Sequence, residues 1–391
     1  MLKILIFILL TIFFIRYEAT SVHAIADPLS APNNKFGIHI LFPGELEQAA
    51  KLVNSNGGDW GYVTIPIQAT DKNVEKWQKF MDDAKTYHII PIIRIASENY
   101  FFDTRVWRKP EEYDVLDFAN FLNSLNWPTV NKYIVVFNEV NRSDEWQGNT
   151  NPQEYAQILN YTVEVFKSLD EDFFIISAGL DNASANVFES SINQYDFMRE
   201  MHKEVPGIFG KIDGLGSHSY PNPGFSEPPW VKTTKSISSF KFERELAEKL
   251  GRKKIPVFIT ETGWSKEAVS ESLIGKYIKE AFETVWSDGN IVAVTPFLLH
   301  AGAGPFFKFT LIDSNGNPNS SYLAIAEISK VKGMPRLQEE NKIELNSSVS
   351  ENLPLKTFKN EDQYDDSSVS ISKAKITTSF LKWFFESINV L

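Results

Sequence analysis

The chain contains no cysteine among its 391 residues. This absence excludes a disulfide framework, a cysteine-ligated zinc or iron–sulfur site, a thiolate nucleophile and a lipoprotein anchor. Basic residues are also outnumbered, with 39 Lys and Arg against 50 Asp and Glu and a net charge of -11. Because this charge opposes binding of a polyanion, we expect no nucleic-acid partner. The charged and hydrophobic fractions, 23% and 43%, are those of an ordinary globular protein.

Long apolar runs are absent except near the N-terminus. Lys3 precedes an apolar run over residues 4–15, and Val22-His23-Ala24 resembles a small-residue cleavage site. The run is shorter than the roughly 20 residues that a membrane span needs. The sequence therefore predicts a cleaved signal peptide over residues 1–24 and a secreted or cell-surface protein. An uncleaved signal anchor is the alternative.

Short β-branched runs alternate with amphipathic stretches between about residues 34 and 330. Several runs are continuously apolar, which is typical of parallel strands covered on both faces. One intervening helix is predicted over 152–169, with Asn151 as its N-cap, Pro152 in its first turn and Glu154 at the capping-box position. Eight such units favour an α/β fold, a (β/α)8 TIM barrel over 25–335, rather than a doubly wound sheet. The predicted strands are 36–41, 60–66, 89–95, 133–138, 173–178, 212–219, 256–261 and 291–298.

The composition changes over residues 336–391. The segment 337–371 is rich in Glu, Asp, Asn, Ser and Lys and is predicted to be a disordered acidic linker. Residues 373–391 then place Ile376, Phe380, Phe384 and Ile388 four positions apart, which predicts an amphipathic C-terminal helix. This helix either contacts a membrane surface or a partner as a peripheral anchor, or folds back onto the barrel or frays.

Polar residues gather where the predicted strands end, which is where a (β/α)8 barrel carries its functional groups. The fourth strand ends at Asn138-Glu139 and the seventh at Glu261, so that two carboxyl groups would face each other across the barrel mouth. Glycosidic cleavage requires such a pair, one group to protonate the leaving oxygen and one to attack or to activate water. Either glutamate alone could instead be a salt-bridge partner of Arg94 or a helix-capping acid.

Three short motifs resemble those of clan A glycoside hydrolases, with similarity to families 39 and 5 over residues 34–330. They are Asn138-Glu139 after the fourth strand, His218-Ser219-Tyr220 after the sixth, and Glu261-Thr262-Gly263-Trp264 after the seventh. The resemblance implies a retaining enzyme that cleaves a β-glycosidic bond in an extracellular poly- or oligosaccharide, with no cofactor and no metal. Glu139 would be the general acid/base and Glu261 the nucleophile.

The resemblance also implies substrate-binding roles. Asn138 would bond the sugar 2-hydroxyl, Tyr220 would orient Glu261, and His218 would contact the acid/base or the substrate. Further substrate-binding candidates lie at or just after strand ends: Arg94, His39, Phe297, Trp146 and Trp264.

Aromatic rings near strand ends are candidate platforms for the apolar face of a sugar. Trp264 and Trp146 are expected in this role, and burial in the core is the alternative for each. The chain departs from the clan in two places. Val140 stands where the clan commonly has proline, and the clan's eighth-strand tryptophan is replaced by the segment 295–300. Phe297, or one of Phe306 and Phe307, is the candidate floor of the central sugar site.

Two other functions compete with the glycosidase. The missing tryptophan fits a non-catalytic, surface-displayed barrel that binds carbohydrate. His39, His218 and His300 near strand ends fit a metal-dependent barrel hydrolase. The sequence lacks both a His-x-His pair on its first strand and a helical H-E-x-x-H motif, so we expect no metal. Sugar specificity and oligomeric state are not encoded in these motifs.

Overall fold

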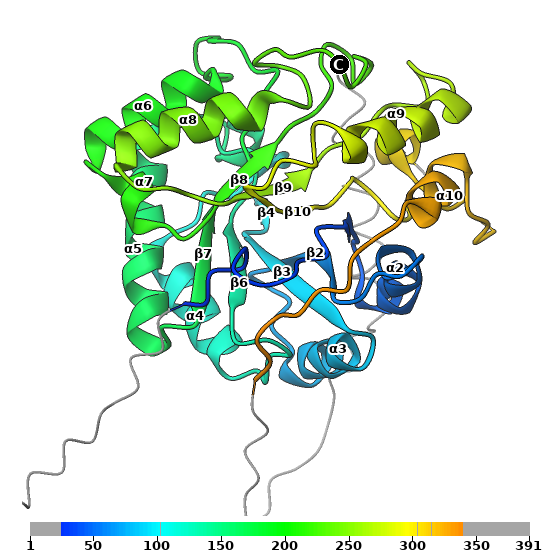
Figure 1. Ribbon diagram of the computed structural model, residues 1–391. Coiled ribbons are helices and arrows are strands. Elements are labelled where there is room, and N and C mark those ends of the chain that lie inside the picture. The colour runs from blue at the N-terminus through cyan, green and yellow to red at the C-terminus, as the bar shows by residue number, and fades with distance from the viewer. Residues whose placement is uncertain (1–24, 102, 303, 314, 339–391) are drawn as a thin grey trace, which may run out of the picture.

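The computed structural model describes residues 25–338 except 102, 303 and 314 (Figure 1). The predicted signal peptide, most of the acidic linker and the C-terminal amphipathic helix therefore lie outside the described residues. Among the helices of the described part, none is both long and apolar enough to cross a membrane.

Eight parallel strands of the described chain close into a barrel. Two hydrogen-bonded sheets, β1-β2-β3-β6-β7 and β8-β9-β10, meet through the bridges Phe36 to Val294 and Ile176 to Gly214. This arrangement confirms the predicted (β/α)8 fold. An antiparallel pair, β4 (Asn99–Tyr100) and β5 (Asp103–Trp107), decorates the connection after the third barrel strand. The barrel strands are β1 (Gly37–His39), β2 (Gly61–Gln68), β3 (Ile89–Ala96), β6 (Lys132–Val136), β7 (Phe173–Ser177), β8 (Leu215–His218), β9 (Val257–Glu261) and β10 (Ile291–Val294).

Helices surround these strands, as Figure 1 shows. Helix α5 has the predicted bounds and cap, since the Asn151 side chain accepts hydrogen bonds from the backbone N–H groups of Gln153 and Glu154. Three short 3-10 helices, η1 (Pro43–Glu45), η2 (Ser143–Glu145) and η3 (Pro305–Phe309), lie in loops that follow β1, β6 and β10. The α-helices are α2 (Leu46–Val53), α3 (Val74–Thr86), α4 (Glu112–Asn123), α5 (Pro152–Leu169), α6 (Gln194–Glu204), α7 (Ile208–Lys211), α8 (Ser239–Gly251), α9 (Glu271–Glu283) and α10 (Ser320–Glu327).

Apolar residues of the strands belong to two layers of the core, as β3 shows. On β3, Ile89, Ile93 and Ile95 join the large cluster that also includes helix residues, whereas Ile90 and Ile92 join a separate cluster with residues of β2, β6, β7, β9 and β10. The second cluster fills the inside of the barrel with large rings. Arg94 follows Ile90 and Ile92 at the same two-residue spacing, so that its side chain also points into the barrel, near the carboxyl end of the strand.

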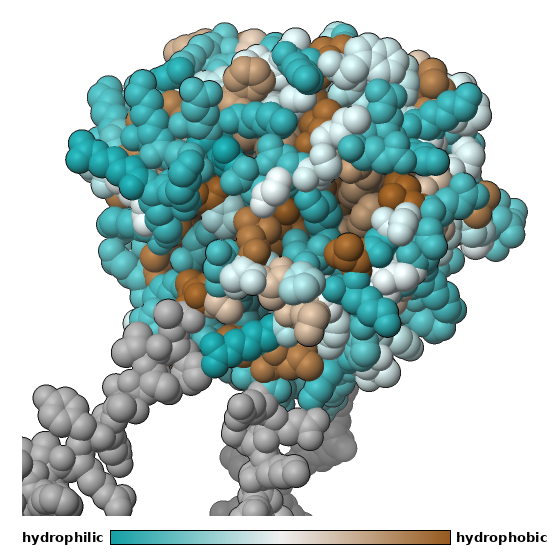
Figure 2. Space-filling view, viewed as in Figure 1, coloured by the Kyte–Doolittle hydropathy of each residue, from teal (hydrophilic) through white to brown (hydrophobic). Residues whose placement is uncertain are grey.

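Two segments close the amino end of the barrel, opposite the strand ends that carry the polar motifs. Residues 25–34 and 330–336 cross in front of the strands in Figure 1, and the Met334 amide donates to the Pro32 carbonyl. Ile25 and Leu29 pack against the inner cluster, and apolar residues gather near the middle of this face in Figure 2. A cavity of about 230 Å³ lies here, lined in part by Tyr62 and Tyr133.

Candidate active site

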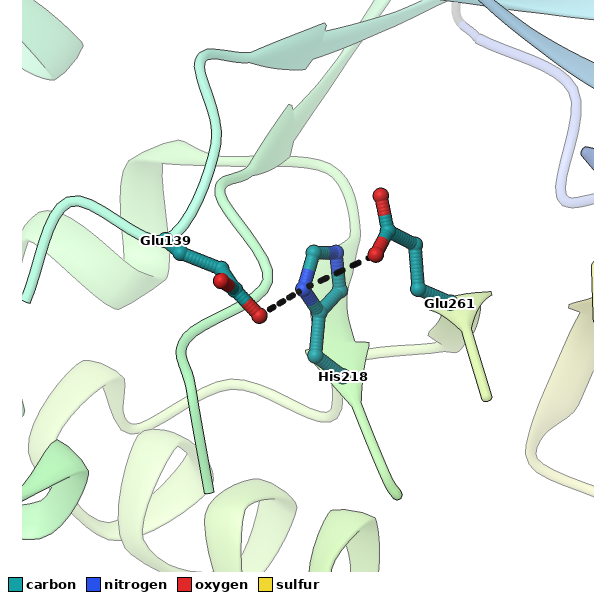
Figure 3. Close-up of side chains that lie close together, drawn as sticks. All are labelled: Glu139, His218 and Glu261. Atoms are coloured by element: carbon teal, nitrogen blue, oxygen red, sulfur yellow. Dashed lines mark hydrogen bonds and ion pairs between the residues drawn. The ribbon is translucent and has the colours of Figure 1, made fainter. Parts of the chain in front are cut away.

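Glu139, His218 and Glu261 converge at the carboxyl end of the barrel (Figure 3). His218 ends β8, Glu261 ends β9, and Glu139 lies in the loop after β6. The His218 ring lies between the two carboxyl groups: its Nδ1 is 2.9 Å from Glu139 Oε1 and 3.8 Å from Glu261 Oε2. One ligand atom from each of the three residues lies within 4.8 Å of the others. The structure thus brings together the two glutamates that the sequence singled out.

The backbone around Glu139 has an unusual local shape. Phe137 and Glu139 both have positive φ, at 69° and 33°, a conformation that residues other than glycine rarely adopt. The Glu139 amide donates to the carbonyl of Gly179 in the connection after β7. A Cβ atom at Gly179 would lie 2.1 Å from His218 Cδ2. Gly179 is therefore required for the close approach of the His218 ring.

Glu261 is surrounded by donors. Arg94 Nη1 donates to Glu261 Oε1 at 2.6 Å, and the Tyr220 hydroxyl donates to Oε2 at 3.1 Å. His39 Nε2 lies 3.6 Å from the same Oε1. The guanidinium places a permanent positive charge against this carboxyl group, which suits an ionised nucleophile. The expected contact between Tyr220 and Glu261 is present, and Arg94 and His39 join the same cluster.

The pKa values of the two histidines of the cluster are shifted in opposite directions. Burial opposes charge on His218, but the carboxyl groups of Glu261 and Glu139 outweigh it and raise the pKa of the imidazole above its ordinary value. The pKa of His39 is lowered well below its ordinary value by burial first, and then by the positive charges of Arg94 and His218. The raised pKa favours the protonated form of His218 beside the two carboxyl groups, and the lowered pKa favours the neutral form of His39.

Arg142 and Glu145 belong to the site although the sequence analysis did not select them. Arg142 Nη1 donates to Glu139 Oε2 at 3.2 Å. Glu145 accepts a hydrogen bond from Asn138 Nδ2 at 2.9 Å. Burial, and then the negative charges of Asp144 and Glu139, raise the pKa of Glu145 to about 8. A sequence signal was present, because both residues lie in the loop that follows Glu139.

Phe297 stands beside the cluster at the end of the eighth barrel strand. Its ring is 7% exposed and meets the His39 ring edge to face, with 5.1 Å between the ring centroids. Phe306 and Phe309 pack against Phe297, and Phe309 continues to Tyr220. An aromatic wall therefore lies on the Glu261 side of the site.

Neither of the two tryptophans expected as sugar platforms is accessible. Trp264 is 2% exposed and Trp146 is 1% exposed. The Trp264 indole donates to the Glu227 carbonyl, and the Trp146 indole donates to the Glu154 carboxyl group. Both rings pack among other aromatic side chains. The platform interpretation does not fit this arrangement, and the alternative of core burial describes both residues.

Glu139, His218 and Glu261 offer the mixed nitrogen and oxygen donors that zinc accepts. The guanidinium of Arg94 is already hydrogen-bonded to Glu261, and its charge opposes a divalent cation there. His300, the third histidine of the metal hypothesis, lies 3.7 Å from Glu45. The site residues therefore fit carboxylate chemistry better than metal chemistry.

No protein-family model matches the sequence, and no curated protein matches it. Solved structures do match the fold. A family 39 glycoside hydrolase from Bacteroides cellulosilyticus has a TM-score of 0.54 at 16% identity, over 77% of this chain and 64% of its own length. A family 39 β-xylosidase from Caulobacter crescentus has a TM-score of 0.53 at 16% identity, over 76% of this chain and 71% of the other.

A third match is a protein of family 5, subfamily 18, from Streptomyces cattleya, solved with the disaccharide Manβ1-4GlcNAc. Its TM-score is 0.54 at 15% identity, over 76% of this chain and 80% of the other. Families 39 and 5 are the two that the sequence motifs resemble. The chain spans less than two thirds of the first of these three proteins. The described chain shares the (β/α)8 fold of clan A glycoside hydrolases.

Proposed function

We propose that the protein is a retaining glycoside hydrolase that cleaves a β-glycosidic bond, with Glu139 as general acid/base and Glu261 as nucleophile. The observation that carries this proposal is the spacing of the two carboxyl groups: an oxygen atom of Glu139 lies within 4.8 Å of an oxygen atom of Glu261, and His218 lies beside both. Carboxyl groups of retaining glycosidases are separated by about 5–5.5 Å, whereas inverting enzymes leave about 6.5–9.5 Å for a water molecule.

The roles are those that the resemblance of the sequence motifs implies for each glutamate. Glu261, paired with Arg94, attacks the anomeric carbon while Glu139 gives its proton to the departing glycosidic oxygen. Water then attacks the anomeric carbon of the glycosyl–enzyme ester, Glu139 takes a proton from that water, and the bond to Glu261 breaks. His218, hydrogen-bonded to Glu139, compensates the changing charge of the pair.

The proposed substrate is a β-linked poly- or oligosaccharide outside the cell. The barrel likeness to a β-xylosidase and to a protein solved with Manβ1-4GlcNAc supports a carbohydrate substrate. Export is proposed from the apolar segment and the cleavage-site pattern within residues 1–24.

The test is a screen of the protein against aryl β-glycosides, β-glucans and xylans. Glu261→Gln and Glu139→Gln are each expected to cut turnover at least about a hundredfold, because each keeps the shape of the side chain and removes its acid–base or nucleophilic chemistry. Glu164→Gln is the matched control, since Glu164 is exposed on α5, the helix that follows the same barrel strand, and accepts its hydrogen bond from Asn160. Full activity in both catalytic variants would rule out the assignment.

One observation favours a second function. Phe297, which is 7% exposed, stands where clan members commonly carry a tryptophan, so that the floor of the sugar site differs. A non-catalytic barrel would bind glycans from the same panel and release no product. A metal-dependent hydrolase would instead lose its activity in a chelator and regain it with added metal.

A further inference from the structure

The side-chain amide of Asn138 is held at both ends. Arg94 Nη1 donates to its Oδ1 at 2.5 Å, and its Nδ2 donates to Glu145 Oε1 at 2.9 Å. A guanidinium can only donate hydrogen bonds, so that only the amide oxygen can face Arg94. Rotation of the amide by 180° would set its NH2 group against the guanidinium and its oxygen against the Glu145 carboxyl group. The guanidinium of Arg94 therefore selects one orientation of the amide, and in that orientation Nδ2 faces the Glu145 carboxyl group.

Glu145 is itself held by its loop. It is the last residue of η2, and the next residue, Trp146, is 1% exposed and bonded through its indole to Glu154. The Trp146 amide donates to the Ser143 carbonyl. The loop also joins β5, because the Gln147 amide donates to the Trp107 carbonyl. The buried tryptophan thus anchors the segment that presents Glu145 to Asn138.

Arg94 links Asn138 to Glu261, the proposed nucleophile. Arg94 Nη1 is shared between Asn138 Oδ1 and Glu261 Oε1, at 2.5 Å and 2.6 Å. A change in the Asn138 amide therefore changes the partner of the guanidinium that holds Glu261. A hydrogen-bonded chain runs from Glu145 through Asn138 and Arg94 to Glu261.

We propose that Glu145 is a positioning residue for the proposed glycosidase, acting through Asn138. By accepting one hydrogen of Nδ2, it fixes the amide so that Asn138 offers a substrate its remaining N–H donor and not its oxygen. The substrate group that meets Asn138 must then accept a hydrogen bond, as a hydroxyl oxygen does and an ammonium group does not. This inference rests on the proposed function. It adds Glu145 to the site as a positioning residue and assigns Asn138 as a hydrogen-bond donor to the substrate.

The kinetic test compares two substitutions of Glu145 on an aryl β-glycoside that the wild type cleaves. Glu145→Ala removes the acceptor and is expected to lower kcat about tenfold with a smaller change in KM, as for the loss of one hydrogen bond. Glu145→Gln keeps an acceptor oxygen at the same reach and is expected to recover most of this loss. Glu164→Gln serves as the control, since Glu164 is exposed on α5 and accepts its hydrogen bond from Asn160. Thermal unfolding checks that each variant is folded.

A double-mutant cycle with Asn138→Ala separates positioning from a general structural role. If Glu145 acts through Asn138, Glu145→Ala costs nothing further in the Asn138→Ala background. Losses that multiply in the double variant would overturn the inference, and so would a Glu145→Gln variant as impaired as Glu145→Ala.

A readout without turnover keeps this inference distinct from the proposed function. The NMR signals of the Asn138 side-chain NH2 group are assigned by their loss in Asn138→Ala. Two separate, slowly exchanging hydrogens are expected in the wild type and in Glu145→Gln, and faster exchange is expected in Glu145→Ala. If the wild type cleaves no glycoside, the proposed function fails while these signals still decide the role of Glu145. Unchanged signals in Glu145→Ala would refute it.

Discussion

Gly179→Ala perturbs the proposed active site without altering any of its side chains. The added Cβ would lie 2.1 Å from His218 Cδ2, whereas real Cβ contacts essentially never fall below 3.0 Å. The ring or the Gly179 backbone must therefore move by about 1 Å. Movement of the ring disturbs the 2.9 Å contact of His218 with Glu139, and movement of the backbone disturbs the Gly179 carbonyl that accepts from the Glu139 amide.

A misplacement of this size at a catalytic group costs about a hundredfold in rate. We therefore expect Gly179→Ala to lower kcat/KM on an aryl β-glycoside by about that factor. Gly44→Ala is the matched control, since Gly44 follows β1 and a Cβ there would meet nothing within 4 Å. Thermal unfolding of each variant shows whether the fold is retained.

The His218→Ala background tests whether the loss of activity in Gly179→Ala arises from the clash with the His218 ring. Without the imidazole, the new methyl group has room, so that Gly179→Ala is expected to cause no further loss in this background. A Gly179→Ala variant as active as the wild type would refute the reasoning. A hundredfold loss that persists in the His218→Ala background would show that the effect does not pass through His218.

Three further predictions follow from single contacts. Tyr220→Phe removes the 3.1 Å hydrogen bond to Glu261 and should lower kcat about tenfold in steady-state assays. An unchanged kcat would contradict this prediction. Burial raises the pKa of Glu243 to about 7, so the folded state resists its ionisation and the free energy of unfolding falls as pH rises from about 4.5 to about 7. In Glu243→Gln, the change in the free energy of unfolding over this pH range should be smaller by about 3 kcal/mol in denaturant titrations. An unaltered pH dependence would show that Glu243 is not its source. Asn151→Ala removes the N-cap of α5 and should lower the free energy of unfolding by about 1 kcal/mol in the same titrations, whereas no change would argue against the cap.

The order of the barrel strands could be predicted because it depends on local patterns. Apolar runs such as residues 89–95 and 173–178 are long enough to mark buried parallel strands, and Asn151-Pro152 marks a helix start through backbone chemistry alone. The pair Glu139 and Glu261 followed from these strands, because parallel strands of a barrel all end at the same face.

Loop geometry explains what the sequence did not reveal. Trp146 and Trp264 follow strand ends, but their loops turn the rings inward against Tyr155 and Trp286. Strand patterning cannot show this, because it fixes no direction for a side chain in a loop. Glu145 was missed for the same reason: its contact with Asn138 arises only when the chain turns at η2.

The configuration of the first sugar product tests the central claim most directly. When the wild type cleaves a β-glycoside, proton NMR recorded within the first minutes identifies the anomer released, before mutarotation mixes the two forms. The spacing of Glu139 and Glu261 predicts a β-anomer, because two displacements at the anomeric carbon restore its configuration. An α-anomer as first product would mean that water attacks directly, and would contradict the assignment of Glu261 as nucleophile.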